Sequence, residues 1–189
     1  TGKTLMETPA IWLRRIEQTQ GWITRVENQQ LLDDALQVGR GVVVLLPHVG
    51  NWEMFNVYIA MHRKTTALYK PPNRRWLRPL LAKIRSNLGN ELVPTTRKGI
   101  ARLYRSLQEG RIVTILPDQV PGAGEYAPFF GQPALTDVLV SRLLKKTSAI
   151  AVCCTVRRER GKFVVRFTAA EAGIYSQDLI ESVAALNKS

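Results

Sequence analysis

The chain has 189 residues, which is enough for one domain with a sizeable core and too few for two domains of ordinary size. Hydrophobic residues make up 45% of it and charged residues 22%, a composition that excludes an intrinsically disordered protein. The 27 Lys and Arg residues outnumber the 15 Asp and Glu residues, and the resulting net charge of +12 favours an anionic partner, whether nucleic acid, anionic lipid or an acidic protein.

Strand-like apolar runs alternate with helix-like segments along the chain, which is typical of an α/β fold with a largely parallel sheet. The chain opens with an amphipathic segment over residues 3–25. The predicted helices cover residues 29–38, 53–61, 74–88 and 99–109, with one more from an N-cap at Thr136 through residue 145. The predicted strands cover residues 42–46, 66–69, 91–94, 112–116, 149–156 and 162–168. The last two strands read as a hairpin, so we expect a mixed sheet of about six or seven strands layered with helices.

Two further segments differ from these regular elements. Residues 117–133 are rich in Gly and Pro, show little helical pattern and are expected to form a long functional loop. Cys153 and Cys154 are adjacent in an apolar run, so we expect two buried thiols on opposite faces of a strand rather than a disulfide. No apolar run approaches the ~20 residues of a membrane-spanning helix, and no Cys/His cluster predicts a zinc site.

The first candidate site is the sequence PHVGNWE at residues 47–53, between a predicted buried strand and a helix. His48 should lie at the carboxyl end of that strand, where open α/β sheets bind ligands. Gly50 permits a tight turn, Asn51 can cap the helix, and Glu53 in the first helical turn can fold back towards the imidazole. A carboxylate on one ring nitrogen leaves the other as a base for a substrate hydroxyl. Spacing alone nevertheless favours a buried loop histidine and an ordinary first-turn glutamate.

The second candidate site is Asp118 and Gln119, at the end of the strand over residues 112–116. Asp118 could orient a base, accept a hydrogen bond from a hydroxyl or bind a cation, and it could equally be a turn residue. Phe129 and Phe130 follow in the long loop, where they could line an acyl channel or simply cover the core.

Two basic segments form a third group. Lys70, Arg74 and Trp76 begin a stretch with leucines at helical spacing, a pattern found at membrane surfaces and also on ordinary solvated helices. Arg97 and Lys98 come just before the helix over residues 99–109. Cations are unfavourable at a helix start, so a bound phosphate would explain them, although surface solubility would too.

Taken together, these segments resemble the bacterial lipid A late acyltransferases, the lauroyl and myristoyl transferases, within the HxxxxD/E glycerolipid acyltransferase superfamily. HVGNWE at residues 48–53 is similar to their HxGNWE motif. Further blocks follow in the family's order and spacing between about residues 21 and 166, namely LYKP at 68–71, LVP at 92–94, RKG at 97–99, ILPDQ at 115–119 and PFFG at 128–131. Two positions depart from the usual pattern, because Glu53 stands where the wider superfamily often has Asp and Lys70 stands where Arg is common.

The resemblance implies a single acyltransferase catalytic domain over residues 1–189, with an N-terminal anchor and a C-terminal end outside this chain. His48 would be the general base and Glu53 would orient it, with no covalent acyl-enzyme. The substrate-binding residues would be Asn51, Lys70, Arg74, Arg97, Lys98, Asp118, Gln119, Phe129 and Phe130.

The same resemblance implies the partners. The donor would be an acyl carrier protein thioester or acyl-CoA, and the acceptor a phosphorylated glycolipid at the cytoplasmic face of the bacterial inner membrane. We expect no metal, no organic cofactor and no nucleic acid. Two alternatives stay open: acylation of another membrane lipid, such as a glycerophosphate or amino-acid lipid, and a non-enzymatic basic protein that binds nucleic acid or anionic lipid.

These expectations make a geometric prediction. His48 and Glu53 should approach hydrogen-bonding distance, and Asp118 should reach the same pocket from a parallel strand. An apolar groove should lead away from His48, with Arg97 or Lys98 near its mouth.

Overall fold

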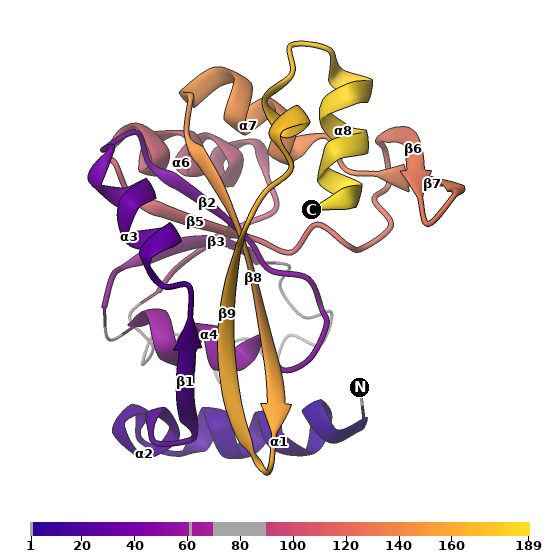
Figure 1. Cartoon of the computed structure of the whole chain (residues 1–189). Coiled ribbons are helices and arrows are strands. Elements are labelled where there is room, and N and C mark those ends of the chain that lie inside the picture. The colour runs from indigo at the N-terminus through magenta and orange to yellow at the C-terminus, as the bar shows by residue number, and fades with distance from the viewer. Residues whose placement is uncertain (1, 61, 70–89) are drawn as a thin grey trace.

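A sheet of seven strands organises the part of the chain described by the computed structural model, which covers residues 2–60, 62–69 and 90–189 (Figure 1). Its strand order is β1-β9-β8-β2-β5-β3-β4. The strands are β1 (Ile23–Glu27), β2 (Val42–Leu45), β3 (Thr65–Tyr69), β4 (Glu91–Pro94), β5 (Ile112–Ile115), β8 (Ile150–Glu159) and β9 (Lys162–Ala169). All neighbouring pairs are parallel except β8 and β9. The expected mixed, largely parallel α/β sheet is confirmed.

The two central strands, β2 and β5, decide where the candidate residues meet. Every residue of both strands is buried, as their uninterrupted apolar runs predict for strands covered on both faces. They pair in parallel register from Val42 with Ile112 to Leu45 with Ile115. Because both strands end at the same edge, the segments that follow them leave the sheet side by side.

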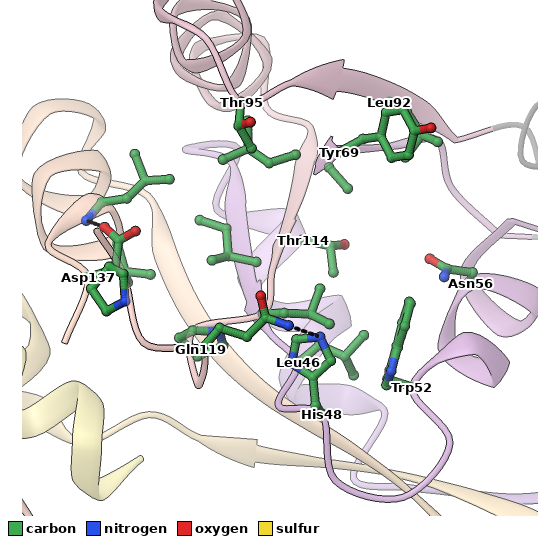
Figure 2. A pocket seen from close by; sticks show the side chains of 18 of the residues that line it. Leu46, His48, Trp52, Asn56, Tyr69, Leu92, Thr95, Thr114, Gln119 and Asp137 are labelled. Atoms are coloured by element: carbon green, nitrogen blue, oxygen red, sulfur yellow. Dashed lines mark hydrogen bonds between the residues drawn. The ribbon is translucent and has the colours of Figure 1, made fainter. Parts of the chain in front are cut away.

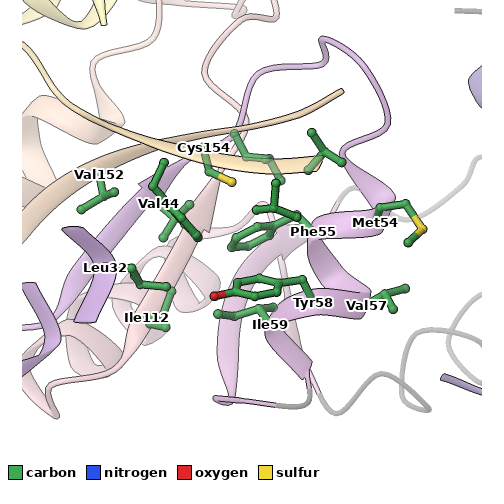
Figure 3. Packing of buried hydrophobic residues seen from close by; sticks show 14 of the residues in the cluster. Leu32, Val44, Met54, Phe55, Val57, Tyr58, Ile59, Ile112, Val152 and Cys154 are labelled. Carbon is green, nitrogen blue, oxygen red and sulfur yellow. The ribbon is translucent and has the colours of Figure 1, made fainter. Parts of the chain in front are cut away.

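Helices cover both faces of this sheet. On one face, α1 (Gly2–Leu13), α3 (Gln30–Gln37) and α4 (Glu53–Ala60) bury a cluster in which Phe55 and Tyr58 pack near Val44 and Cys154 (Figure 3). The short α2 (Ile16–Gln20) packs on this same face. The other face carries α6 (Arg97–Gln108), α7 (Leu139–Thr147), α8 (Leu179–Lys188) and the 3-10 turn η1 (Ala172–Tyr175). Cys153 belongs to this second cluster, so the two thiols do point to opposite faces. Burial raises the pKa of Cys153 to about 11, which keeps that thiol protonated at neutral pH.

The helix ends largely agree with the sequence. α3 and α6 are each followed by a glycine with positive φ, Gly39 at 77° and Gly110 at 72°, as their stop signals predict. α6 begins two residues earlier than expected, because Thr96 caps it by accepting a hydrogen bond from the backbone of Gly99. The predicted helix over residues 74–88 lies outside the described residues. None of the described helices is both long and apolar enough to cross a membrane.

The amphipathic segment predicted over residues 3–25 needs a correction, because it ends in a strand. α1 and α2 are followed by β1, which pairs in parallel with β9 at the edge of the sheet. β1 is a short edge strand with Thr24 and Arg25 exposed, so it lacks the apolar run that identified the central strands.

The loop predicted over residues 117–133 also needs a correction, because its second half is a hairpin. β6 (Glu125–Phe129) and β7 (Gln132–Thr136) pair around a two-residue turn, with Phe130 and Gly131 at positive φ (Figure 1). Pro128 and Pro133 face each other across it, and proline weakens any sequence signal for a strand. Thr136 ends β7 and donates a hydrogen bond to Asn187, so it is not the cap of α7; the backbone of Leu139 donates to Asp137 instead.

Candidate active site

His48 lies in the segment that follows β2, and Asp118 holds it from the segment that follows β5. The His48 ring Nδ1 lies 2.7 Å from one carboxylate oxygen of Asp118, and the His48 backbone N–H donates to the other oxygen, also at 2.7 Å. The two side chains are each about one third exposed. A carboxylate that accepts from Nδ1–H fixes the ring orientation and the tautomer, so Nε2 keeps its lone pair and can act as a base.

The free side of the imidazole faces Gln119. Its side-chain amide nitrogen lies 3.3 Å from Nε2 of His48, as the dashed line in Figure 2 shows. Trp52 packs edge-on against the same ring, with 5.6 Å between the ring centroids. Nε2 is thus in contact with a weak, exposed partner that a substrate hydroxyl could replace. Asp118 and Gln119 reach the candidate site as the parallel register predicts.

The carboxylate that pairs with the His48 ring is that of Asp118, and the orienting role expected of Glu53 stays a prediction. Glu53 is 3% exposed, lies in the first turn of α4 and accepts a hydrogen bond from Asn56 at 3.2 Å. The reason lies in the order of the strands. The segment after β2 crosses towards β8, on the side of β2 away from β5, before α4 begins. Asp118, in contrast, leaves the strand next to β2 and meets His48 directly.

The crossing towards β8 is fixed by Gly50 and Asn51. Gly50 has a φ of 69°, and a Cβ there would lie 1.9 Å from the carbonyl oxygen of Val156, so only glycine fits. The backbone N–H of Asn51 donates to the same carbonyl at 3.0 Å. The side chain of Asn51 is buried and donates to Glu7 of α1 at 2.7 Å, and Glu7 also binds Arg158.

Asn51 was expected to cap α4 and contact substrate, and the structure places it elsewhere. Its side chain faces α1, and it does not line the pocket beside His48. Its buried Oδ1 accepts no hydrogen bond within the described residues, so it makes no capping bond to α4. The residue anchors the segment that carries His48.

A pocket of about 450 Å³ opens beside His48 at the carboxyl ends of the central strands (Figure 2). One wall is apolar and lies on the face covered by α6 and α7; it includes Leu68, Ile115, Leu139 and Val140. The α4 side of the pocket has the apolar residues Leu46, Trp52 and Leu116. It also has a polar group, which we call the polar wall: Glu53, Asn56, Asn90 and Thr114. The sequence predicted an apolar groove leading away from His48; the structure has a pocket at this place whose lining is partly apolar and partly polar.

Sequence reasoning did not identify the polar residues beyond Glu53. Thr114 was detectable as the one polar residue in the apolar strand β5, and Asn56 as the polar residue one helical turn after Glu53. Asn90 gave no such signal, because only the pairing of β3 with β4 brings it beside α4.

The remaining predicted site residues do not line this pocket or lie outside the described residues. Arg97 and Lys98 are exposed at the start of α6, just beyond Thr95, which lines the pocket, so they lie near its rim. Phe129 and Phe130 do not line the pocket beside His48: their rings contact each other at the hairpin tip, and Phe130 is 93% exposed. The pairing of β6 with β7 explains this, because a two-residue turn directs both rings outwards. Lys70 and Arg74 lie outside the described residues.

No cluster of three or more His, Cys, Asp or Glu side chains that could hold a metal ion occurs within the described ranges. The chemistry that this arrangement offers is that of an imidazole oriented at one nitrogen and open to a pocket at the other. An imidazole held in this way, at the carboxyl edge of a parallel sheet, has the arrangement that general base catalysis on a hydroxyl requires.

Comparison with known proteins identifies the class. Residues 1–189 match the family described as bacterial lipid A biosynthesis acyltransferase, and the chain belongs to that family. Its members are enzymes that use an acyl donor and a lipid acceptor. The resemblance inferred from the motifs is confirmed.

Two curated relatives share part of this sequence, and both are named phosphatidylinositol mannoside acyltransferase. The protein of Mycobacterium tuberculosis is 29% identical over 123 residues, which are 62% of this chain and 39% of the relative. That of Mycolicibacterium smegmatis is 29% identical over 122 residues, which are 61% of this chain and 40% of the relative. The matched segment thus covers about two fifths of the length of these relatives.

Proposed function

We propose that this chain is the catalytic part of an enzyme that moves a fatty acyl group from a thioester donor to a hydroxyl of a lipid A precursor. The observation that carries the proposal is the pair of His48 and Asp118, which leaves Nε2 of His48 facing a pocket whose lining is partly apolar and partly polar. Family membership supports the reaction class and the lipid acceptor.

In the proposed mechanism, Nε2 of His48 removes the proton from the acceptor hydroxyl while Asp118 holds the ring and stabilises its protonated form. The oxygen attacks the thioester carbonyl directly, the carbon–sulfur bond breaks, and the proton on His48 passes to the leaving thiolate. No Ser or Cys hydrogen-bonds to the His48 ring among the described residues, in keeping with direct transfer.

The tetrahedral intermediate needs a hydrogen-bond donor for its oxyanion. The backbone amides of His48 and Asn51 already donate to Asp118 and Val156. Gln119 offers a side-chain amide 3.3 Å from Nε2, close to the place where the carbonyl must lie. We therefore assign the oxyanion contact to the side-chain amide of Gln119.

For the substrates, we propose an acyl carrier protein as the donor and the cytoplasmic face of the bacterial inner membrane as the place of reaction. An acidic carrier suits the net charge of +12. The exposed Arg97 and Lys98 would bind a phosphate of the acceptor or of the phosphopantetheine arm.

The test is an acyl-transfer assay with the full-length protein in detergent micelles. It presents a lipid A precursor with a panel of acyl carrier protein and acyl-CoA thioesters of several chain lengths. We expect transfer to the precursor, faster from the carrier protein than from CoA. The absence of transfer from every thioester to every lipid would overturn the proposed function.

A second candidate acceptor is a mannosylated phosphatidylinositol, because the two mycobacterial relatives carry that activity in their names. The same assay distinguishes the two acceptors when both are offered at equal concentration. A higher kcat/KM for the mannoside would reassign the acceptor and leave the reaction unchanged.

A further inference from the structure

The polar wall of the pocket lies on the face of the sheet that α4 covers. Along β5, Ile112 packs in the cluster beneath α4, whereas Val113 and Ile115 pack in the cluster beneath α6 and α7. Because side chains alternate along a strand, Thr114 points to the α4 side, as does Leu116. The pocket spans the end of the sheet, so its two walls are contributed by opposite faces.

The amides of this wall form a chain of hydrogen bonds. Asn56 donates to Glu53 at 3.2 Å, and Asn90 donates to Asn56 at 3.4 Å. The hydroxyl of Thr65 donates to Asn90 at 2.9 Å. Each carboxamide has two N–H donors and two acceptor positions, and these bonds use one of each. Asn56 and Asn90 can therefore each donate and accept once more.

Thr114 supplies the second, independent observation. Its side chain is 3% exposed and lines the pocket, yet its hydroxyl has no hydrogen-bond partner among the described residues. Buried hydroxyls are almost always paired, because an unpaired one loses its bonds to water without replacement. Figure 2 shows Thr114 inside the pocket, between Gln119 and Asn56. A ligand in the pocket would provide the missing partner.

We infer that Thr114, Asn56 and Asn90 form a subsite for a polyol ring, the sugar of the acceptor headgroup, and determine specificity for it. A sugar hydroxyl both donates and accepts, which matches neutral amides and a neutral hydroxyl, whereas a phosphate needs donors or cations. The apolar wall, opposite this subsite, takes the acyl chain. The inference rests on the proposed function, and it assigns the acceptor headgroup to the polar wall of the pocket.

The experiment compares two threonines on neighbouring strands, both buried. Thr114→Val removes an unpaired hydroxyl, while Thr66→Val removes one that is paired with Ser106 at 2.8 Å on the other face of the sheet. In the full-length protein we expect Thr114→Val to raise the KM for the glycolipid acceptor roughly tenfold, the loss typical of one hydrogen bond to substrate. Its thermal stability and the KM for the thioester donor should stay unchanged. Thr66→Val should show the reverse, with lower stability and an unchanged acceptor KM.

Two further arms complete the test. Thr114→Ser keeps the hydroxyl and should restore the acceptor KM, and Asn56→Leu should raise it as Thr114→Val does. Direct binding to lipid A precursor micelles is measured beside phosphatidic acid micelles, which carry phosphate without sugar. The wild-type protein should prefer the glycolipid, and both Thr114→Val and Asn56→Leu should reduce that preference.

Each contrary result has a distinct meaning. If Thr114→Val raises the donor KM instead, or leaves both the acceptor KM and the glycolipid preference unchanged, the subsite assignment is wrong. If the wild-type protein transfers no acyl group, the proposed function fails, and the binding arm still decides whether this wall recognises sugar.

Discussion

Two carboxylates lie near His48, and they come from different parts of the chain. Glu53 belongs to the same motif, five residues further along the chain, and lies buried in the first turn of α4. Asp118 is 70 residues away in sequence and makes both hydrogen bonds to His48, one to the ring and one to the backbone. The comparison shows that closeness within a motif does not decide which carboxylate contacts the imidazole. The order of strands in the sheet decides it.

The largest expected effect concerns the base itself. His48→Ala should reduce kcat for acyl transfer by roughly 10²–10⁴-fold, because general base catalysis contributes about that much. Circular dichroism and thermal unfolding would verify that the variant folds. His62→Ala is a matched control, since His62 is exposed and contacts Tyr58 rather than the pocket. Near-normal turnover by a folded His48→Ala protein would rule out the mechanism.

The next effect compares the two carboxylates directly. Asp118→Asn should lower kcat on the order of 10²-fold, because an amide can donate to Nδ1 and favour the wrong tautomer of His48. The measurement is steady-state kcat with both substrates saturating. If Glu53→Gln lowers kcat more than Asp118→Asn does, Glu53 is the orienting acid, as the motif alone suggested.

Glu53→Gln should have a smaller effect of another kind. Glu53 accepts from Asn56 in the polar wall, so the change should loosen that wall and raise the acceptor KM by roughly tenfold, the equivalent of about one hydrogen bond to a charged group. The kcat at saturating acceptor should change little. A fall in kcat at an unchanged acceptor KM would contradict this assignment.

A weaker effect is expected for Glu7, which holds Asn51 in the segment between His48 and Glu53. Glu7→Ala removes the acceptor of the buried Asn51 amide and should destabilise the protein by about 1–2 kcal/mol. Urea unfolding measures the stability, and amide hydrogen exchange over residues 48–52 reports local opening. Glu7→Gln keeps a side-chain acceptor and serves as the control. Equal stability of Glu7→Ala and the wild type would show that α1 does not hold the segment carrying His48.

The smallest effect concerns charge at the pocket rim. Arg97→Ser and Lys98→Ser should each raise the KM for phosphorylated substrates a few-fold at low salt, and the difference should shrink as salt screens the exposed charges. Arg160→Asn removes one charge from the turn between β8 and β9, where Arg160 has a φ of 46°, and should leave the KM unchanged. Equal effects at both places would indicate a general charge effect rather than a phosphate site.

The sequence by itself determined the sheet, the two strand ends and the family. The apolar runs of β2 and β5 predicted buried strands, and a parallel pair brings the residues after them, His48 and Asp118, to one edge. Local signals also sufficed for the ends of α3 and α6, because caps and left-handed glycines act within a few residues.

Only the tertiary structure decided which side chains meet. Asn51 faces α1 instead of substrate because Gly50 docks on Val156, a contact between segments more than 100 residues apart in sequence. Phe129 and Phe130 point outwards because the pairing of β6 with β7 turns the hairpin tip away from the pocket. The polar wall exists because β3 and β4 bring Asn90 beside α4. Contacts of this kind depend on strand order and loop path, which composition and periodicity do not encode locally.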